Sequence, residues 1–306
     1  MGPSNRKRGT PMNEIEVKAY AKLNLSLDVL GRLDNGYHEM KMVMQTASLC
    51  DDVAVRLTDG GGITVQSNFG FLPRDGNNIA AKAAAAFFAA ADMPGAGAAI
   101  TLRKRIPVGA GLGGGSADAA AVLRALNALC GAPLGIPALE ALGETLGSDV
   151  PFCVRGGTRL AVGRGERLLP APEMPDCGIV ICKPRFSIRT PDLFARIDSR
   201  RSRIHPDTDG LLHAMAAGDL PGLARRMYNV FEDVLPRSCG EIGAIKHALL
   251  DAGALGAVMT GTGSAVFGLF PDGAGAQAAA AALKARWRDS FAAAPVRETE
   301  AEEKEA

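Results

Sequence analysis

The chain lacks several features that would place it in common classes of protein. None of its apolar runs reaches the roughly eighteen residues of a membrane span, and its N-terminus has no apolar core of a secretory signal. Its formal net charge is only +1, which gives no electrostatic reason to bind nucleic acid. We therefore expect a cytoplasmic protein, a monomer or homodimer, whose partners are small molecules and neither nucleic acid nor membrane.

The chain also lacks a pattern of paired cysteines and internal repeats. Its six cysteines form no Cys-x-x-Cys pair, so they are expected to be reduced core residues and not a disulfide frame or a zinc site. A length of 306 residues, 47% of them hydrophobic, allows one large or two ordinary domains. The polar ends, residues 1–13 and 299–306, are predicted to be disordered.

Glycine is abundant, and five glycines between Gly109 and Gly115 precede Ser116. Such a loop can turn tightly and bring backbone N–H groups close to a ligand. The apolar spacing that follows predicts a helix over residues 119–130, and a helix N-terminus behind a glycine loop favours an anion, most often phosphate. The loop is not a Walker loop, because no lysine follows Gly115. Two alternatives remain, a dinucleotide-binding G-x-G-x-x-G turn and a loop that only packs a helix. The half-polar strand before Pro107 disfavours the first of them.

Residues 15–29 alternate with a period of two, which predicts a long strand with one buried face. Lys22 and Asn24 lie on its opposite, exposed face, about 6–7 Å apart; the pattern alone favours an ordinary solvated surface. A turn over residues 31–36 leads to Tyr37 and His38, which are either surface residues or a stacking and hydrogen-bonding pair for a planar ligand.

The rest of the chain predicts an α+β fold with its helices on one face of a sheet. Asn78 is expected to cap a helix that runs towards Pro94, and Asp149, by default, to cap another. A hairpin that ends near Glu166 marks the predicted domain boundary, which gives domains of residues 1–166 and 167–306. The second domain is predicted to contain strands at 178–182, 256–259, 265–270 and near 296, and helices at 191–197, 211–215, 220–231, 242–250 and up to 287.

Five segments in this order resemble the GHMP kinases: 21–24, 35–38, 107–116, 147–152 and 260–263. The resemblance covers roughly residues 18–270, and it is most similar to the branch that phosphorylates a cytidine diphosphate-linked methylerythritol for isoprenoid synthesis. It implies a two-domain GHMP kinase fold, with an N-terminal domain like domain 2 of ribosomal protein S5 and a ferredoxin-like C-terminal domain.

The resemblance also implies phosphoryl transfer from ATP to the C2 hydroxyl of the methylerythritol. Asp149 would accept the hydroxyl proton, and Lys22 would keep Asp149 ionised and stabilise the transferring group. Mg²⁺ is expected with the nucleotide, with no protein ligand identified. The implied ATP site is made of Asn78, Lys104, Pro107, Val108, Gly109, Ala110, Gly111, Leu112, Gly113, Gly114, Gly115 and Ser116.

For the acceptor, the resemblance implies that Tyr37 and Phe194 enclose cytosine while His38 contacts its edge. The remaining implied substrate residues are Asn24, Thr190, Thr260, Gly261 and Thr262. Ala117 stands where the family has a second serine, which removes a possible hydroxyl contact, and Asp118 would repel phosphates unless it faces away or meets Mg²⁺. Arg185 and Arg189 add positive charge near the expected diphosphate. The alternatives are a homoserine or mevalonate-type kinase, or a non-catalytic nucleotide-binding regulator.

Overall fold

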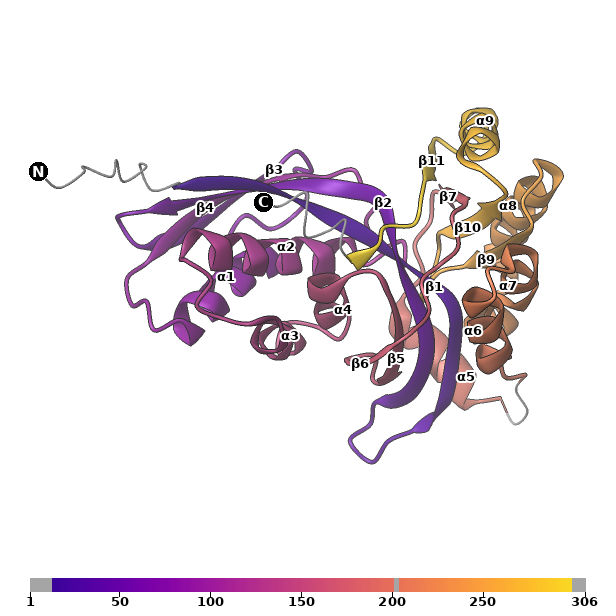
Figure 1. Ribbon diagram of the computed structural model, residues 1–306, viewed down its shortest axis with the longest axis horizontal. Helices are drawn as coiled ribbons and strands as arrows, with labels where there is room; N and C mark the ends of the chain where they lie inside the picture. The colour runs from indigo at the N-terminus through magenta and orange to yellow at the C-terminus, as the bar shows by residue number, and fades with distance from the viewer. Residues whose placement is uncertain (1–12, 201–203, 299–306) are drawn as a thin grey trace, which may run out of the picture.

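The computed structural model describes residues 13–200 and 204–298, which form two β-sheets with helices packed against them (Figure 1). The first sheet has seven strands in the order β3-β4-β2-β1-β8, with β5 paired to β2 and β6 paired to β5. The second sheet has four strands in the order β11-β7-β10-β9. None of the helices in the described ranges is long and apolar enough to cross a membrane. The predictions for residues 1–12 and 299–306 fall outside the described residues.

The first part of the chain, residues 13–170, supplies most of the large sheet and the four helices that cover one face of that sheet (Figure 1). Its strands are β1 (Glu14–Arg32), β2 (His38–Thr58), β3 (Gly62–Ser67), β4 (Gly97–Arg103), β5 (Thr158–Gly163) and β6 (Arg167–Pro170). Its helices are α1 (Ile79–Ala90), α2 (Gly114–Leu129), α3 (Ile136–Glu144) and α4 (Val150–Arg155). Asn78 caps α1 as predicted, because its side chain accepts a hydrogen bond from the Ala80 N–H.

The second part supplies the small sheet. The strands of this second part are β7 (Gly178–Lys183), β8 (Tyr228–Asn229), β9 (Gly256–Met259), β10 (Val266–Phe270) and β11 (Asp289–Ala293). Of these, β8 pairs with β1 in the first sheet. Its α-helices are α5 (Thr190–Asp198), α6 (Thr208–Ala216), α7 (Leu220–Arg226), α8 (Gly240–Asp251) and α9 (Gly273–Leu283), with 3-10 helices η1 (Val230–Val234) and η2 (Arg237–Cys239). The predicted boundary at residue 166 falls in the turn between β5 and β6, inside a hairpin of the first sheet; it stays a prediction.

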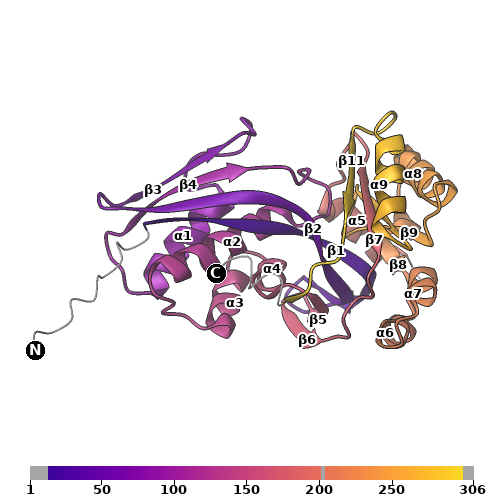
Figure 2. The same ribbon diagram turned by 45° about the horizontal axis from the view of Figure 1, so that its top comes forward.

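β1 and β2 are long antiparallel strands that run from the helical layer towards the second sheet, as both views show (Figures 1 and 2). Residues 21–29 of β1 are buried on both faces. The expected exposed face around Lys22 and Asn24 was therefore wrong, because the second part of the chain covers it. A period of two identifies which residues share a face, but it says nothing about a partner from distant sequence.

The second sheet is covered on both faces. α8 and α9 pack on one face with Val180 and Val266, whereas Ile181 and Phe267 on the other face pack with α6, α7 and Leu25 of β1. The expectation of helices on one face is therefore incomplete.

Three predicted elements end differently in the structure. The helix predicted over 220–231 stops at Arg226, because the chain then extends to pair Tyr228 and Asn229 with β1. The spacing of Leu139, Leu142 and Leu146 predicts a helix that is closed by Gly147, but α3 ends at Glu144. The strand predicted near Val296 lies earlier, as β11, although Val296 still donates a backbone hydrogen bond to Thr46.

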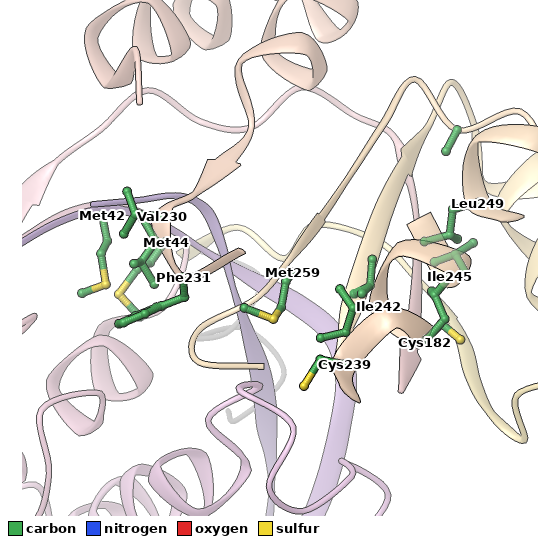
Figure 3. Close-up of a cluster of buried hydrophobic side chains, with 14 of the residues drawn as sticks. Met42, Met44, Cys182, Val230, Phe231, Cys239, Ile242, Ile245, Leu249 and Met259 are labelled. Carbon is green, nitrogen blue, oxygen red and sulfur yellow. The ribbon is translucent and has the colours of Figure 1, made fainter. Parts of the chain in front are cut away.

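A continuous apolar cluster joins the two parts of the chain (Figure 3). Met42 and Met44 of β2 lie beside Val230 and Phe231 of η1 at one end, and residues of α8 lie at the other. Met259 lies between the two groups in this view. The end of β9 leads into a second glycine-rich turn, residues 260–264, and is thus fixed in a core shared by both sheets.

Candidate active site

The glycine loop at residues 109–115 is folded tightly against two other segments. Gly109, Gly111 and Gly113 have positive φ angles of 65°, 78° and 69°, and Gly113 precedes the first turn of α2. A Cβ atom at Gly111 would lie 2.2 Å from the Thr260 carbonyl oxygen, and one at Gly113 would lie 2.8 Å from Lys22 Cγ. Glycine is therefore required here both by conformation and by close packing.

The loop separates two cavities. One, of about 420 Å³, is lined by the loop, by Asn78 and Lys104, and by apolar residues such as Leu72 and Ile106. The other, of about 910 Å³, is a cleft lined by Lys22, Asp149, the Gly36–His38 turn, α5 and residues 261–263. Gly109, Gly111, Gly113 and Ser116 line both, so a phosphate chain held by the loop would reach from one cavity into the other.

Lys22 and Asp149 meet in the larger cleft, which they line together with the loop glycines that border both cavities. Lys22 Nζ lies 3.4 Å from Asp149 Oδ2, and the side chains are 6% and 32% exposed, respectively. β1 holds Lys22 beside the loop, because its backbone N–H donates to the Leu112 carbonyl. Asp149 stands at the N-cap position of α4, but its side chain makes no capping hydrogen bond. The carboxylate is thus left to face the ammonium and the cleft.

Asn24 and Thr260 lie behind the cleft wall. Both side chains are fully buried, and Asn24 Oδ1 accepts hydrogen bonds from Lys22 Nζ at 2.8 Å and from the Gly261 N–H at 3.0 Å. The Asn24 N–H donates to Thr260 Oγ1. The prediction that these residues line a substrate pocket is not met in this structure; they join β1 to the second glycine-rich turn.

Lys104 forms a buried cluster with two carboxylates at the edge of the smaller cavity. Its ammonium lies 2.5 Å from both Asp51 Oδ2 and Asp118 Oδ2, and it also donates to the Gly114 carbonyl. Burial raises the pKa of Asp118 to about 7, and the charge of Asp51 acts in the same direction against the opposing charge of Lys104. Asp118 therefore faces a cation and is partly protonated near neutral pH. Both effects reduce the repulsion of phosphates that was expected from the sequence.

The other departure from the family pattern has little effect on the cavities. Ala117 is 2% exposed and packs in the core under α2, outside the lining of either cavity. The side chain of a serine at this position would therefore lie in that core and outside the cavities. The expected loss of a phosphate contact is therefore not supported.

Tyr37, His38 and Phe194 all line the larger cleft. The His38 ring is stacked on Phe194, with centroids 4.4 Å apart and planes at 23°, and His38 Nε2 lies 2.8 Å from Asp198 Oδ1. Tyr37 is 56% exposed, with the Arg164 guanidinium 5.2 Å from the centre of its ring. The structure thus brings these three rings, from a turn and from α5, to one cleft, with His38 placed against Phe194.

Three basic side chains lie in the lining of this cleft, and they come from Lys22, Arg32 and Arg164. Arg185 and Arg189, which were expected to add charge here, are not among its lining residues. Thr190 and Thr262 do line it, and their hydroxyls are 2.8 Å apart. They connect the first turn of α5 to the second glycine-rich turn.

Sequence reasoning missed Asp51 and Asn229. Asp51 Oδ1 accepts from the backbone N–H of Ile106 and so fixes the entry to the glycine loop. Asn229 holds the second glycine-rich turn from behind. Neither lies in a recognisable motif: Asp51 is one of two adjacent aspartates between β-type segments, and Asn229 stands between Tyr228 and Val230.

Comparisons with known proteins agree with this geometry. The family model "GHMP kinases N terminal domain" matches residues 78–157, and "GHMP kinases C terminal" matches residues 211–289. The chain is 41% identical over 261 residues to the 4-diphosphocytidyl-2-C-methyl-D-erythritol kinase of Lachnospira eligens, which covers 85% of this chain and 90% of that one. The chain belongs to this family of GHMP kinases. A second member, from Acetivibrio thermocellus, is 40% identical over 85% of this chain and 91% of its own length.

Solved structures of GHMP kinases share the fold. A crystal structure of 4-(cytidine 5'-diphospho)-2C-methyl-D-erythritol kinase matches with a TM-score of 0.79 and 36% identity, over 92% of this chain and 99% of that one. Homoserine kinase from Cytophaga hutchinsonii matches with a TM-score of 0.74 and 23% identity, over 96% of this chain and 98% of that one. The second likeness concerns the fold alone. The predicted GHMP kinase fold and family are confirmed.

Proposed function

We propose that this chain transfers the γ-phosphoryl group of ATP to the C2 hydroxyl of 4-diphosphocytidyl-2-C-methyl-D-erythritol, as the names of its family members indicate. The observation that carries the proposal is the Lys22–Asp149 pair in the cleft, which shares its lining with the loop residues that also border the smaller cavity. A nucleotide in the smaller cavity and an alcohol in the cleft would place donor and acceptor on either side of this pair.

Each residue has a physical role in this proposal. Asp149 accepts the proton of the attacking hydroxyl, since its carboxylate is partly exposed to the cleft. Lys22 lies beside Asp149, and its fixed ammonium offsets the negative charge that spreads over the transferring group. The backbone of residues 109–116 surrounds the phosphates, and the positive end of α2 favours their charge.

Mg²⁺ would supply further charge neutralisation and would arrive with the nucleotide. Asp149 and Ser116 offer oxygen atoms in the cleft, and in residues 13–200 and 204–298 no group of three or more His, Cys, Asp or Glu is arranged to hold a metal ion. The nucleotide phosphates and water would therefore supply most of its ligands.

The aromatic lining favours an acceptor that carries a base. Tyr37, His38 and Phe194 provide flat surfaces that homoserine or mevalonate would leave unused. A cytidine base can stack there, while Thr190 and residues 261–263 line the same cleft. This arrangement supports the cytidylated acceptor over the other GHMP kinase substrates.

ADP release with a panel of alcohols tests the proposal. We expect turnover with the cytidylated methylerythritol and at least about 100-fold lower kcat/KM with homoserine or mevalonate, because these lack the base. Equal activity with homoserine would overturn the assignment of the acceptor.

The Asp149→Ala variant tests the catalytic assignment and the regulator alternative. We expect it to bind ATP with unchanged affinity but to lose about 100- to 10,000-fold in kcat, because the base is gone. Isothermal titration and a coupled ADP assay measure the two quantities. A parent enzyme that binds ATP and turns over none of the alcohols would instead favour a non-catalytic regulator.

A further inference from the structure

Asn229 is a buried residue outside every motif, and its amide group is fully engaged. It lies on the two-residue strand β8, paired with Leu27 of β1, and it is 1% exposed. Its Nδ2 donates to the carbonyl oxygens of Met259 at 2.7 Å and Gly261 at 2.8 Å. Its Oδ1 accepts from the Phe231 N–H at 3.0 Å. Both carbonyls belong to the segment that enters the second glycine-rich turn.

Gly261 is held from its other side by the site already described. Its N–H donates to Asn24 Oδ1 at 3.0 Å, and the same oxygen accepts from the Lys22 ammonium at 2.8 Å. Gly261 itself has a φ of 56°, and a Cβ atom there would lie 2.9 Å from the Gly111 carbonyl oxygen. The position of this one residue thus affects the oxygen that orients Lys22 and also the glycine loop.

A second contact fixes the same strand end. The Met259 N–H donates to Glu232 Oε1 at 2.7 Å, and Glu232 Oε2 pairs with Lys246. Asn229 and Glu232, three residues apart, therefore hold the N–H and the C=O of Met259. Asn229 and Glu232 thus support the turn from behind the cleft, and neither is among the residues that line it.

We propose that Asn229 is a positioning residue for phosphoryl transfer: by fixing Gly261 it sets Asn24 Oδ1, and through that oxygen the place of the Lys22 ammonium beside Asp149. The inference rests on the proposed function. An amide is needed because two carbonyl oxygens require two N–H donors from one side chain. A carboxylate at this position would face both oxygens with no donor, and an alanine would leave two buried acceptors unpaired.

The test compares Asn229→Ala with Asn127→Ala. Asn127 is a matched control, because it is also a mostly buried asparagine that fixes a backbone segment. Its amide bonds the Leu134 N–H and C=O at 3.0 and 2.9 Å, away from both cavities of the site. We expect both variants to melt at lower temperature than the parent. Only Asn229→Ala should lose kcat, by about 10- to 100-fold, with the Kd for ATP within about threefold of the parent.

Asn229→Ser keeps one donor and serves as a milder variant should Asn229→Ala not fold. Its kcat should fall between those of the parent and of Asn229→Ala, measured at a temperature where each variant is folded by circular dichroism. A kcat for Asn229→Ser and Asn229→Ala equal to that of Asn127→Ala would overturn the inference. A parent enzyme without acceptor-dependent ADP release would overturn the proposed function instead, so the two failures are distinguishable.

Discussion

At the scale of single residues, the site depends on charges that are placed next to each other inside the protein. Lys22 and Lys104 are both buried, and each has carboxylates within 4 Å. Lys22 has one partly exposed partner and lines the cleft, whereas Lys104 has two buried partners at the edge of the smaller cavity. We therefore assign a chemical role to the Lys22 pair and a structural role to the Lys104 cluster.

The titration of Asp118 makes the free energy of unfolding depend on pH. Because burial raises its pKa to about 7, the folded chain binds a proton that the unfolded chain releases near its ordinary value of 3.8. The resulting contribution to the free energy of unfolding is fully present below about pH 4 and decreases as the pH rises towards 7. Above pH 7 it no longer changes.

The Asp118→Asn variant removes this titration, because the amide carries no charge and keeps the shape. We compare the free energy of unfolding of the variant with that of the parent. The difference, variant minus parent, should be at least about 1 kcal/mol larger at pH 8 than at pH 5. Urea denaturation at both pH values measures the difference. A constant difference between the two proteins would show that Asp118 does not titrate in this range.

At the scale of elements, the two glycine-rich turns form one unit. The Ala265 N–H donates to the Ala110 carbonyl, and Thr260 approaches Gly111 so closely that no side chain fits there. Sequence analysis found both turns, since glycine runs are visible in the sequence. It could not show that they touch, because 149 residues separate Gly111 from Thr260.

The Gly111→Ala variant tests this unit. A methyl group would meet the Thr260 carbonyl oxygen at 2.2 Å in a backbone region that alanine disfavours. We expect a loss of about 2–5 kcal/mol in the free energy of unfolding and a loss of ATP binding. Thermal melting and ATP titration measure both effects. Gly243→Ala on α8, where nothing lies within 4 Å, is the control and should melt at or slightly above the parent temperature.

The sequence predicted the long strand β1 and most helices well, because their apolar periods are strong. It was wrong at Asn24 and at residues 227–231 for a related reason. Asn24 lies on a polar strand face that distant chain covers, and the segment 227–231 looks helical until Asn229 pairs with β1. Both errors arise where contacts between the two parts of the chain override the local pattern.

At the scale of the whole molecule, the two parts share a core and should unfold together. Leu25 of β1 is fully buried and packs in one cluster with Ile181 and Phe267 of the second sheet. Trp287, the single tryptophan, lies in the second part with its Nε1 donating to Glu241. Its fluorescence therefore reports the second part alone.

We expect Leu25→Ala to lower the free energy of unfolding by about 2–5 kcal/mol, because the cavity would lie between the two sheets. Its loss of tryptophan fluorescence and of far-UV circular dichroism should coincide in a denaturant titration. Leu169→Ala, at a side chain that is 45% exposed, is the control and should change little. Two separated transitions in the parent protein would contradict a shared core.

The burial of residues 21–29 on both faces has a consequence for building chimeric enzymes from relatives. A crossover at the midpoint of the chain would join a foreign C-terminal half to a native strand whose surface was shaped for another partner. Hybrids that take residues 21–29 and the C-terminal half from the same parent would keep complementary packing between β1 and the second sheet. For recombination, the set of residues that must come from one parent is thus discontinuous in the gene.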